Sequence, residues 1–330
     1  MARRRKQLEI ANFTLTFGTE KTLLDLAEEI VIPAFLEGHR RDYRNGSYFF
    51  LNTELIDLGD DPENPFLCII GKFIKDTVLR REQRYDDELG EVIADEEFLQ
   101  SSPDALFVLI LNNHRLLYLK ETSFAPNITS FQATVKEFLF RQYHILLRRL
   151  EGEYDSLEDL EREYPPPDLR IIPLSNTSNL REFINKYQIL KSVEVRLYPR
   201  NSNLDNDPFF DIMAQKRRAI HSSVTVFRHE NRGDGLDKEE SIEQLEEVSS
   251  QANHRIKMQG EDVNGNKLVG TNEDIKIEVP VEYIPTNTIE AAHHLKTVYT
   301  NLIQNGVVAS DRIIDNVTNK IKQIRDNFLT

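Results

Sequence analysis

Four consecutive polar residues, Asn112-Asn113-His114-Arg115, interrupt an otherwise apolar segment and are the first place to look for chemistry. They lie between the apolar runs ALFVLIL and LLYL, so they either present a histidine base or only connect two strands. No nucleophile or metal-binding pattern accompanies His114, and asparagine tolerates the positive φ angle of tight hairpin turns. The pattern predicts a turn between two buried strands. The alternative is a contact role, with His114 and Arg115 presented at a hairpin tip.

The familiar catalytic and cofactor-binding motifs do not occur in the sequence. Neither GxxxxGK[ST] nor GxGxxG is present, which argues against the common phosphate-binding loops, and HExxH and GxSxG do not occur either. His293 and His294 are adjacent on a predicted helix, where their side chains point about 100° apart and do not easily chelate one metal ion. We therefore expect no catalytic residue, no cofactor and no metal.

One strand pattern keeps a nuclease open as an alternative. Asp274-Ile275-Lys276-Ile277-Glu278 places three polar side chains on one face of a predicted strand. A metal-dependent nuclease needs clustered carboxylates that hold a divalent cation, often with a lysine nearby. The same alternation also describes any half-exposed strand. Asp274 and Glu278 are the candidate residues of this alternative.

Charge is unevenly distributed along the chain. With 41 basic and 55 acidic residues the net charge is −14, which argues against a purely electrostatic nucleic-acid binder. Segregated clusters can still create one basic surface on an acidic body, although each cluster also suits a solvated helix end or turn. Besides Arg115, the candidate nucleic-acid contacts are a basic N-terminal arm of Arg3, Arg4, Arg5 and Lys6, and a helix end with Lys216, Arg217 and Arg218.

The hydrophobic patterns predict an α+β protein: an antiparallel sheet domain with packed helices, then a small α/β sandwich and a C-terminal helical pair. Residues 1–150 form the first domain in this interpretation. Residues 151–168 are acidic and end in three prolines before Asp168, which predicts a linker. Residues 169–285 alternate between strands and helices, and Asn264-Gly265 is a strong hairpin signal.

The C-terminal residues 286–330 carry a heptad-like seam. Its apolar positions are spaced 3, 4, 3 and 4 apart, as in an a/d seam. The seam predicts self-association or a partner helix, and a helix pair that packs on its own domain is the alternative. About two regular heptads favour a local bundle over a long coiled coil. The seam consists of Ile314, Val317, Ile321, Ile324 and Phe328.

Cysteine use and hydropathy indicate the cellular setting. A single cysteine, Cys68, excludes an internal disulfide, and its place in FLCIIG is typical of a small core residue. The N-terminus has no long apolar stretch of the kind found in secretory signals. Apolar runs such as Ala105–Leu111 are far short of the roughly 20 residues of a membrane helix. We expect a cytoplasmic protein without direct membrane insertion.

Several segments together resemble a known group of proteins. The order of elements resembles an uncharacterised bacterial family associated with phage defence, which is similar to the lambda exclusion protein RexA and, more remotely, to the DNA-binding subunit of the Kiwa system. The resemblance covers about residues 105–140 and 190–283. It is carried by FVLILNNHRLLYLKETSFAPNITSFQATVKEFL, LKSVEVRLYPRNSN, KRRAIHSSVTVFRHENRGDGLD, GEDVNGNKLVG and IKIEVPVEY.

The resemblance implies an anti-phage role in which a dimer binds DNA without sequence preference, often beside a membrane effector encoded nearby. No catalytic residue can be carried over. The acidic net charge departs from that picture and leaves room for a protein ligand. Three hypotheses follow: a non-catalytic nucleic-acid-binding sensor or regulator that acts as an oligomer, a protein-interaction or antitoxin-like subunit, and a metal-dependent nuclease.

Overall fold

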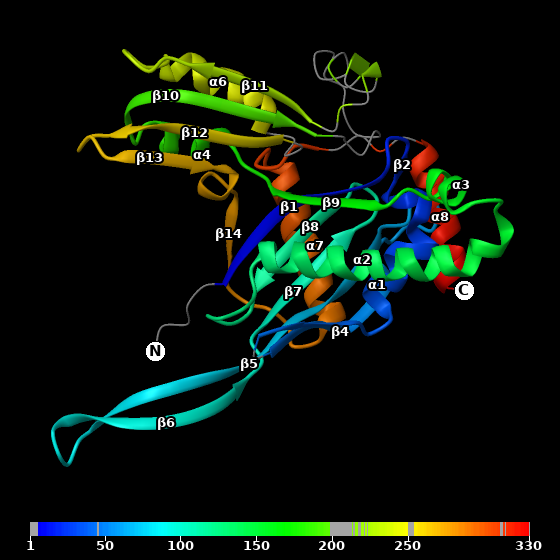
Figure 1. Cartoon of the computed structure of the whole chain (residues 1–330), viewed down its shortest axis with the longest axis horizontal. Helices are drawn as coiled ribbons and strands as arrows, with labels where there is room; N and C mark the ends of the chain where they lie inside the picture. Colours follow the sequence, from blue (N-terminus) through cyan, green and yellow to red (C-terminus); the bar gives the residue numbers. More distant parts are fainter. Residues whose placement is uncertain are drawn as a thin grey trace.

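The structure is a computed structural model of the chain, shown whole in Figure 1. Its elements belong to two antiparallel sheets joined by helices. The described residues are 6–44, 46–198, 213, 215–216, 219–220, 222, 224–249, 254–310, 313 and 315–329.

The large sheet has ten strands. Its main order is β14-β1-β8-β7-β5-β4-β3, while β2 and β9 also pair with β1 and β6 pairs with β5. Its central strands are continuous apolar runs because both of their faces are buried. The strands are β1 (Lys6–Phe17), β2 (Lys21–Thr22), β3 (Arg40–Tyr43), β4 (Gly46–Asp57), β5 (Leu67–Asp86), β6 (Glu91–Ser101), β7 (Asp104–Ile110), β8 (Arg115–Lys120), β9 (Pro167–Pro173) and β14 (Glu278–Val281).

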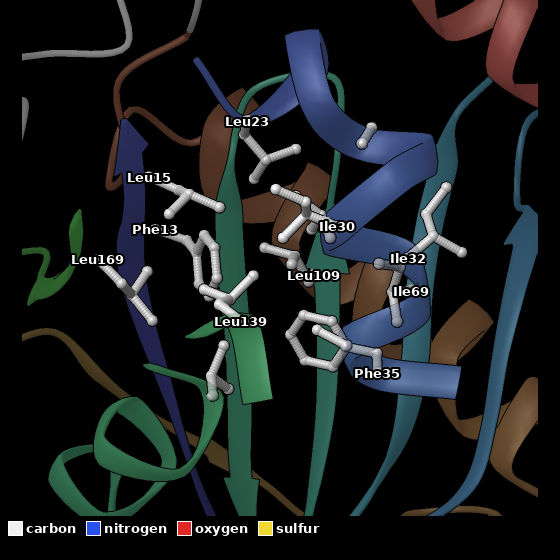
Figure 2. Close-up of a cluster of buried hydrophobic side chains, with 14 of the residues drawn as sticks. Phe13, Leu15, Leu23, Ile30, Ile32, Phe35, Ile69, Leu109, Leu139 and Leu169 are labelled. Atoms are coloured by element: carbon white, nitrogen blue, oxygen red, sulfur yellow. The ribbon is translucent and has the colours of Figure 1, made fainter. Parts of the chain in front are cut away.

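Helices cover both faces of the large sheet. On one face Phe131 of α2 lies in an aromatic cluster, with its ring centroid 5.2 Å from that of Phe107 and 5.4 Å from that of Phe73. Figure 2 shows part of this core, where Phe35 and Ile30 lie over the sheet. This face carries η1 (Leu23–Leu26), η2 (Ala27–Val31), α1 (Ile32–Leu36), α2 (Ile128–Leu150), α3 (Leu157–Glu163) and α8 (Asp315–Leu329), and η3 (Glu151–Glu153) follows α2.

The opposite face of the large sheet is covered by α7 (Thr288–Gln304). Asn287 caps this helix by accepting hydrogen bonds from the backbone N–H groups of Ile289 and Glu290. Leu295 and Tyr299 are buried in the core on this side. Both faces of the central strands β7 and β8 are therefore removed from water.

The small sheet has the strand order β11-β10-β12-β13. Helices α4 and α6 cover one of its faces through a core that includes Phe183, Leu245 and Met258. The predicted hairpin at Asn264-Gly265 joins β12 to β13, and Gly265 adopts a φ of +76°. The elements are β10 (Tyr187–Leu197), β11 (Thr225–Glu230), β12 (His254–Asp262), β13 (Lys267–Thr271), α4 (Thr177–Ile184), α6 (Lys238–Ser249) and η4 (Asn272–Asp274).

The α+β fold class is confirmed, and strand pairing joins segments across the predicted domain boundaries. Strand β9, which begins inside the predicted linker at Pro167, pairs with β1 over Ala11–Phe17 of the large sheet. Strand β14 pairs with the other half of β1, over Lys6–Glu9. The prolines end α3 and lead directly into a strand, and Leu160 of α3 lies in the core. One long strand thus takes partners from both predicted domains.

Strands β5 and β6 extend beyond the sheet as a two-stranded arm. Thr77 of β5 pairs with Gly46 of β4, and beyond it β6 is the only described strand that pairs with β5. We call the segment from Val78 to Gln100 the arm. In Figure 1 it leaves the large sheet on the side away from the small sheet.

A candidate anion-binding face on the small sheet

The side of the small sheet that no described helix covers carries a group of cations. Val195 and Ile256, which pair with each other, point into the core against the two helices. Because side chains alternate along a strand, the neighbouring residues point to the other side. The register places Arg196 beside Arg255 on that side, and Lys257 beside Glu194. We call this surface the basic face and define it by Arg196, Arg228, Arg255, Lys257 and Lys267.

Acidic neighbours neutralise only part of the basic face. Arg196 pairs with Glu194 at 2.7 Å, and this hydrogen bond raises the pKa of the guanidinium above its usual value. Arg228 pairs with the partly exposed Glu230 at 3.2 Å. Among the residues that the structure describes, Arg255, Lys257 and Lys267 form no ion pair.

The adjacent cations have an energetic consequence. Like charges directly opposite each other on neighbouring strands are unfavourable, and Arg196 lies opposite Arg255. An anion held between the two guanidinium groups relieves that repulsion. The exposed face is thus arranged to bind negative charge.

A pocket of about 500 Å³ lies where the basic face meets the large sheet. Its size falls in the range of small-molecule and cofactor sites, roughly 300–1,000 Å³. The pocket lies between the two sheets, so residues that are distant in the sequence line it together. They come from the start of α2 (Ile128, Thr129, Gln132), from β9 (Ile171, Ile172, Pro173), from β10 and its end (Glu194, Arg196, Tyr198), from β12 (Arg255, Ile256, Lys257) and from β13 and η4 (Thr271, Asn272, Glu273).

An aromatic ring lies among the cations of the pocket. The Arg170 guanidinium lies 4.2 Å from the centroid of the Tyr198 ring, and that of Arg255 lies 6.0 Å from the same centroid. Arg170 is also held by an ion pair with Asp168. An aromatic surface between guanidinium groups suits a ligand that combines a flat ring with negative charge.

The first turn of α2 adds to the positive potential of the pocket. Asn127 caps the helix by accepting a hydrogen bond of 2.9 Å from the Ser130 backbone N–H. The residues that follow the cap, Ile128 and Thr129, line the pocket. The positive end of the helix dipole therefore points toward the same space. The arrangement can bind and orient an anion.

Two of the cations predicted from sequence in the N-terminal arm and the helix end, Lys6 and Lys216, fall within the described residues. Lys6 begins β1 and pairs with Glu121 at 3.4 Å. Lys216 is exposed on a helical segment. The remaining predicted cations, Arg3, Arg4, Arg5, Arg217 and Arg218, lie outside the described residues.

The opening turn is confirmed, and the predicted contact role of Arg115 is wrong. Residues 111–114 connect β7 to β8, but the hairpin end is buried: Arg115 is 3% exposed and His114 is 0% exposed. Asn112 accepts a hydrogen bond from the Leu67 backbone N–H, and Asn113 donates one to the Tyr299 hydroxyl. A residue enclosed in this way cannot reach a phosphate.

His114 is the unusual member of that turn. It adopts a φ of +57°, in the left-handed region, and neither ring nitrogen has a hydrogen-bond partner among the described residues. Burial lowers the pKa of His114 to about 4, and the nearby Arg115 acts in the same direction. The ring is therefore neutral at physiological pH and serves packing.

The candidate nuclease carboxylates are engaged separately. Asp274 accepts hydrogen bonds from the Thr271 backbone N–H at 2.8 Å and from its hydroxyl at 3.0 Å, as part of a capping box. Glu278 pairs with Lys276 at 3.1 Å. Within the described ranges no group of three or more metal-ligating side chains occurs. The geometry gives the nuclease alternative no support.

The C-terminal seam faces its own chain. Val317, Ile321 and Ile324 are at most 2% exposed and lie in the core beneath the large sheet's helices. Phe328 is 41% exposed, and Ile314 lies outside the described residues. The prediction of an oligomerisation surface is therefore wrong for the three buried positions, because the seam is already covered by α8's own domain.

The site on the small sheet was missed by sequence reasoning. The signal was present in VEVRLY and HRIKM, where charged and apolar residues alternate strictly. Alternation indicates that one face of the strand is exposed to solvent, but it does not say which strands lie beside each other. Arg170 is distant in sequence from the other cations and carried no signal of its own.

Comparisons with known proteins do not assign this chain to a family. No protein-family model matches it, and no curated protein matches it significantly. No helix in the described stretches is both long enough and apolar enough to cross a bilayer.

Proposed function

We propose that this chain is a non-catalytic protein that binds nucleic acid through the basic face of its small sheet. The observation that carries the proposal is that Arg170 and Arg255 lie beside the Tyr198 ring, and that this ring lines the inter-sheet pocket together with Arg196, Arg255 and Lys257. Cations positioned beside an aromatic ring are the combination that single-stranded nucleic-acid sites use. The acidic body elsewhere directs a polyanion to this one surface.

The extent of the basic face favours a polymer over a small anion. Arg228 lies on β11, Arg196 on β10, Arg255 on β12 and Lys267 on β13, so cations occupy all four strands. A single phosphate would contact only part of such a surface. A phosphate backbone can contact several of these strands at once.

The biological role that we propose is that of a sensor or regulator in anti-phage defence, with DNA as the nucleic acid. Its support is the sequence resemblance to the phage-defence family. That resemblance also suggests a neighbouring membrane or effector protein as the partner that responds. The genes adjacent to this one test this part of the proposal independently of DNA binding, because a neighbouring gene for a membrane or effector protein would support it.

Fluorescence anisotropy with labelled single-stranded and duplex DNA tests the binding site. Four phosphate contacts should weaken binding roughly 100-fold between 50 and 200 mM salt. The double variant Arg255→Glu/Lys257→Glu should lower the affinity at least 100-fold at 50 mM salt, because it replaces two unpaired cations with repelling anions.

The matched control is Arg148→Glu/Arg149→Glu. These adjacent cations are exposed near the end of α2. Their replacement by glutamate changes the net charge by the same amount as the Arg255→Glu/Lys257→Glu double variant. We expect the control to change affinity less than about threefold, since distant exposed charges are screened. Equal losses in both double variants would mean that net charge, and not the basic face, governs binding. No binding at 50 mM salt would refute the function.

A further inference from the structure

The arm is a surface without a partner in the described part of the chain. Its two strands pair only with each other, and an isolated two-stranded ribbon is marginally stable in water. It nevertheless exposes large apolar side chains. These are Val78 (41% exposed), Leu79 (42%), Tyr85 (59%), Leu89 (66%), Val92 (63%), Phe98 (63%) and Leu99 (47%).

The apolar residues form patches on both sides of the ribbon. Leu79 pairs with Leu99, and Tyr85 pairs with Val92, so each pair shares a side. Phe98 lies on the opposite side, paired with Arg80. Such a concentration of exposed apolar side chains is typical of an interaction site.

The arm is strongly acidic. Between Val78 and Gln100 it contains three arginines and eight acidic residues, which gives a net charge of −5. The arginines are occupied within the ribbon, as when Arg80 pairs with Glu96 at 2.7 Å. Two arms placed side by side would repel each other, most strongly at the tip, where Asp87, Glu88 and Glu91 are all exposed. The partner of the arm must therefore be basic and partly apolar.

The basic face of the small sheet has both properties. It presents five cations against Glu194, Glu230 and Glu261. Two exposed valines lie on the same side of the sheet, because Val226 pairs with Arg196 and Val269 pairs with Gln259. The arm and the basic face thus match in charge and in apolar character.

We propose that the arm of one copy of this chain docks on the basic face of a second copy. Docking within one chain does not fit, since the arm and the small sheet extend from opposite sides of the large sheet (Figure 1). If two copies exchange arms, each contributes one arm and one face, and the assembly closes as a dimer. The proposal uses the basic face but does not depend on nucleic-acid binding.

A charge-swap experiment tests the docking. The first variant, Asp87→Lys/Glu88→Lys/Glu91→Lys, changes the net charge of the arm from −5 to about +1. It leaves the ion pairs of the arm's arginines intact. The second variant, Arg255→Glu/Lys257→Glu, reverses part of the face. Light scattering at 1 and 100 μM protein and 50 mM salt, without nucleic acid, gives the mass of each species.

We expect the wild type to approach twice 38.4 kDa at 100 μM and to dissociate as salt rises. Each variant alone should be monomeric. An equimolar mixture of the two variants should regain the dimer mass, since the reversed arm fits the reversed face and the natural arm fits the natural face. Recovery in the mixture also shows that both variants are folded.

Several outcomes would overturn the docking proposal. These are a wild type that is monomeric at 100 μM, a face variant that remains dimeric, an arm variant that remains dimeric, or a mixture that does not regain mass. DNA binding separates this proposal from the proposed function. An arm variant that binds DNA but gives no charge-swap recovery refutes docking alone. A monomeric arm variant that binds no DNA, although its basic face is free, refutes the nucleic-acid function alone.

Discussion

The two sheets of this protein differ in how completely they are covered. Helices pack on both faces of the centre of the large sheet, whereas the described helices of the small sheet, α4 and α6, cover one of its faces. Strand β7 is accordingly buried at every position from Ala105 to Ile110, while β12 alternates between buried and exposed positions. The covered centre of the large sheet provides stability, and the exposed face of the small sheet offers a surface on which ligands can bind.

Polar residues are buried at the centre of the large sheet and exposed on the basic face of the small sheet. In the large sheet even the polar hairpin end at His114 is enclosed and hydrogen-bonded inward by its asparagines. In the small sheet, cations such as Arg255 remain exposed and lack an ion pair among the described residues. Polar residues therefore have opposite roles in the two regions, and their types alone do not reveal which role applies.

The largest expected loss of stability comes from a substitution in the aromatic core of the large sheet. Phe131 is fully buried and contacts several aromatic rings. Phe131→Ala should lower the free energy of unfolding by about 3–5 kcal/mol in urea denaturation, because it leaves a cavity. Val226→Ala on the 48% exposed outer side of the small sheet should change it by no more than about 0.5 kcal/mol. Equal effects would erase the proposed contrast between the sheets.

The C-terminal seam should behave as core of the large-sheet region. Ile321 is 0% exposed, so Ile321→Ala should lower the free energy of unfolding by about 2–5 kcal/mol. Phe328→Ala, at an exposed position of the same helix, should have a much smaller effect. Thermal denaturation at several protein concentrations checks the assignment. A stability loss in Ile321→Ala that disappears at high concentration would restore the seam to an intermolecular role.

The buried histidine should make the large-sheet region sensitive to acid. The pKa of His114 is about 4 in the folded chain and about 6.5 when unfolded. Its contribution to stability is fully present above pH 6.5 and declines as pH falls toward 4, because only the unfolded chain takes up the proton. Between pH 7 and 5 this loss is about 2 kcal/mol.

The variant His114→Asn isolates that contribution, since asparagine tolerates the positive φ angle and does not titrate in this range. Urea denaturation at pH 7 and pH 5 should show a smaller pH-dependent loss in His114→Asn than in the wild type. His293→Asn, at an exposed position of α7, should retain the full loss. Identical pH dependence in His114→Asn and the wild type would show that the ring is not excluded from water.

Much of the local structure could be predicted from the sequence. The alternation in HRIKM, the Asn264-Gly265 turn and the apolar runs on each side of His114 depend on interactions between neighbouring residues, and the structure contains all three. The α+β class follows from the same local patterns. Such patterns are governed by side-chain periodicity and backbone preference, which a single sequence displays directly.

Which helices and strands pack against each other was decided only by the tertiary structure. The sequence determined that residues 317–324 form an apolar helix face, but the burial of Ile321 within the same chain depends on the distant strands and helices that meet it. The addition of β9 and β14 to β1 is likewise a long-range pairing. Arg170 lies beside Tyr198 only because the small sheet packs next to β9. Contacts between residues far apart in the chain depend on the packing of whole elements, and that packing leaves no periodic trace in the sequence.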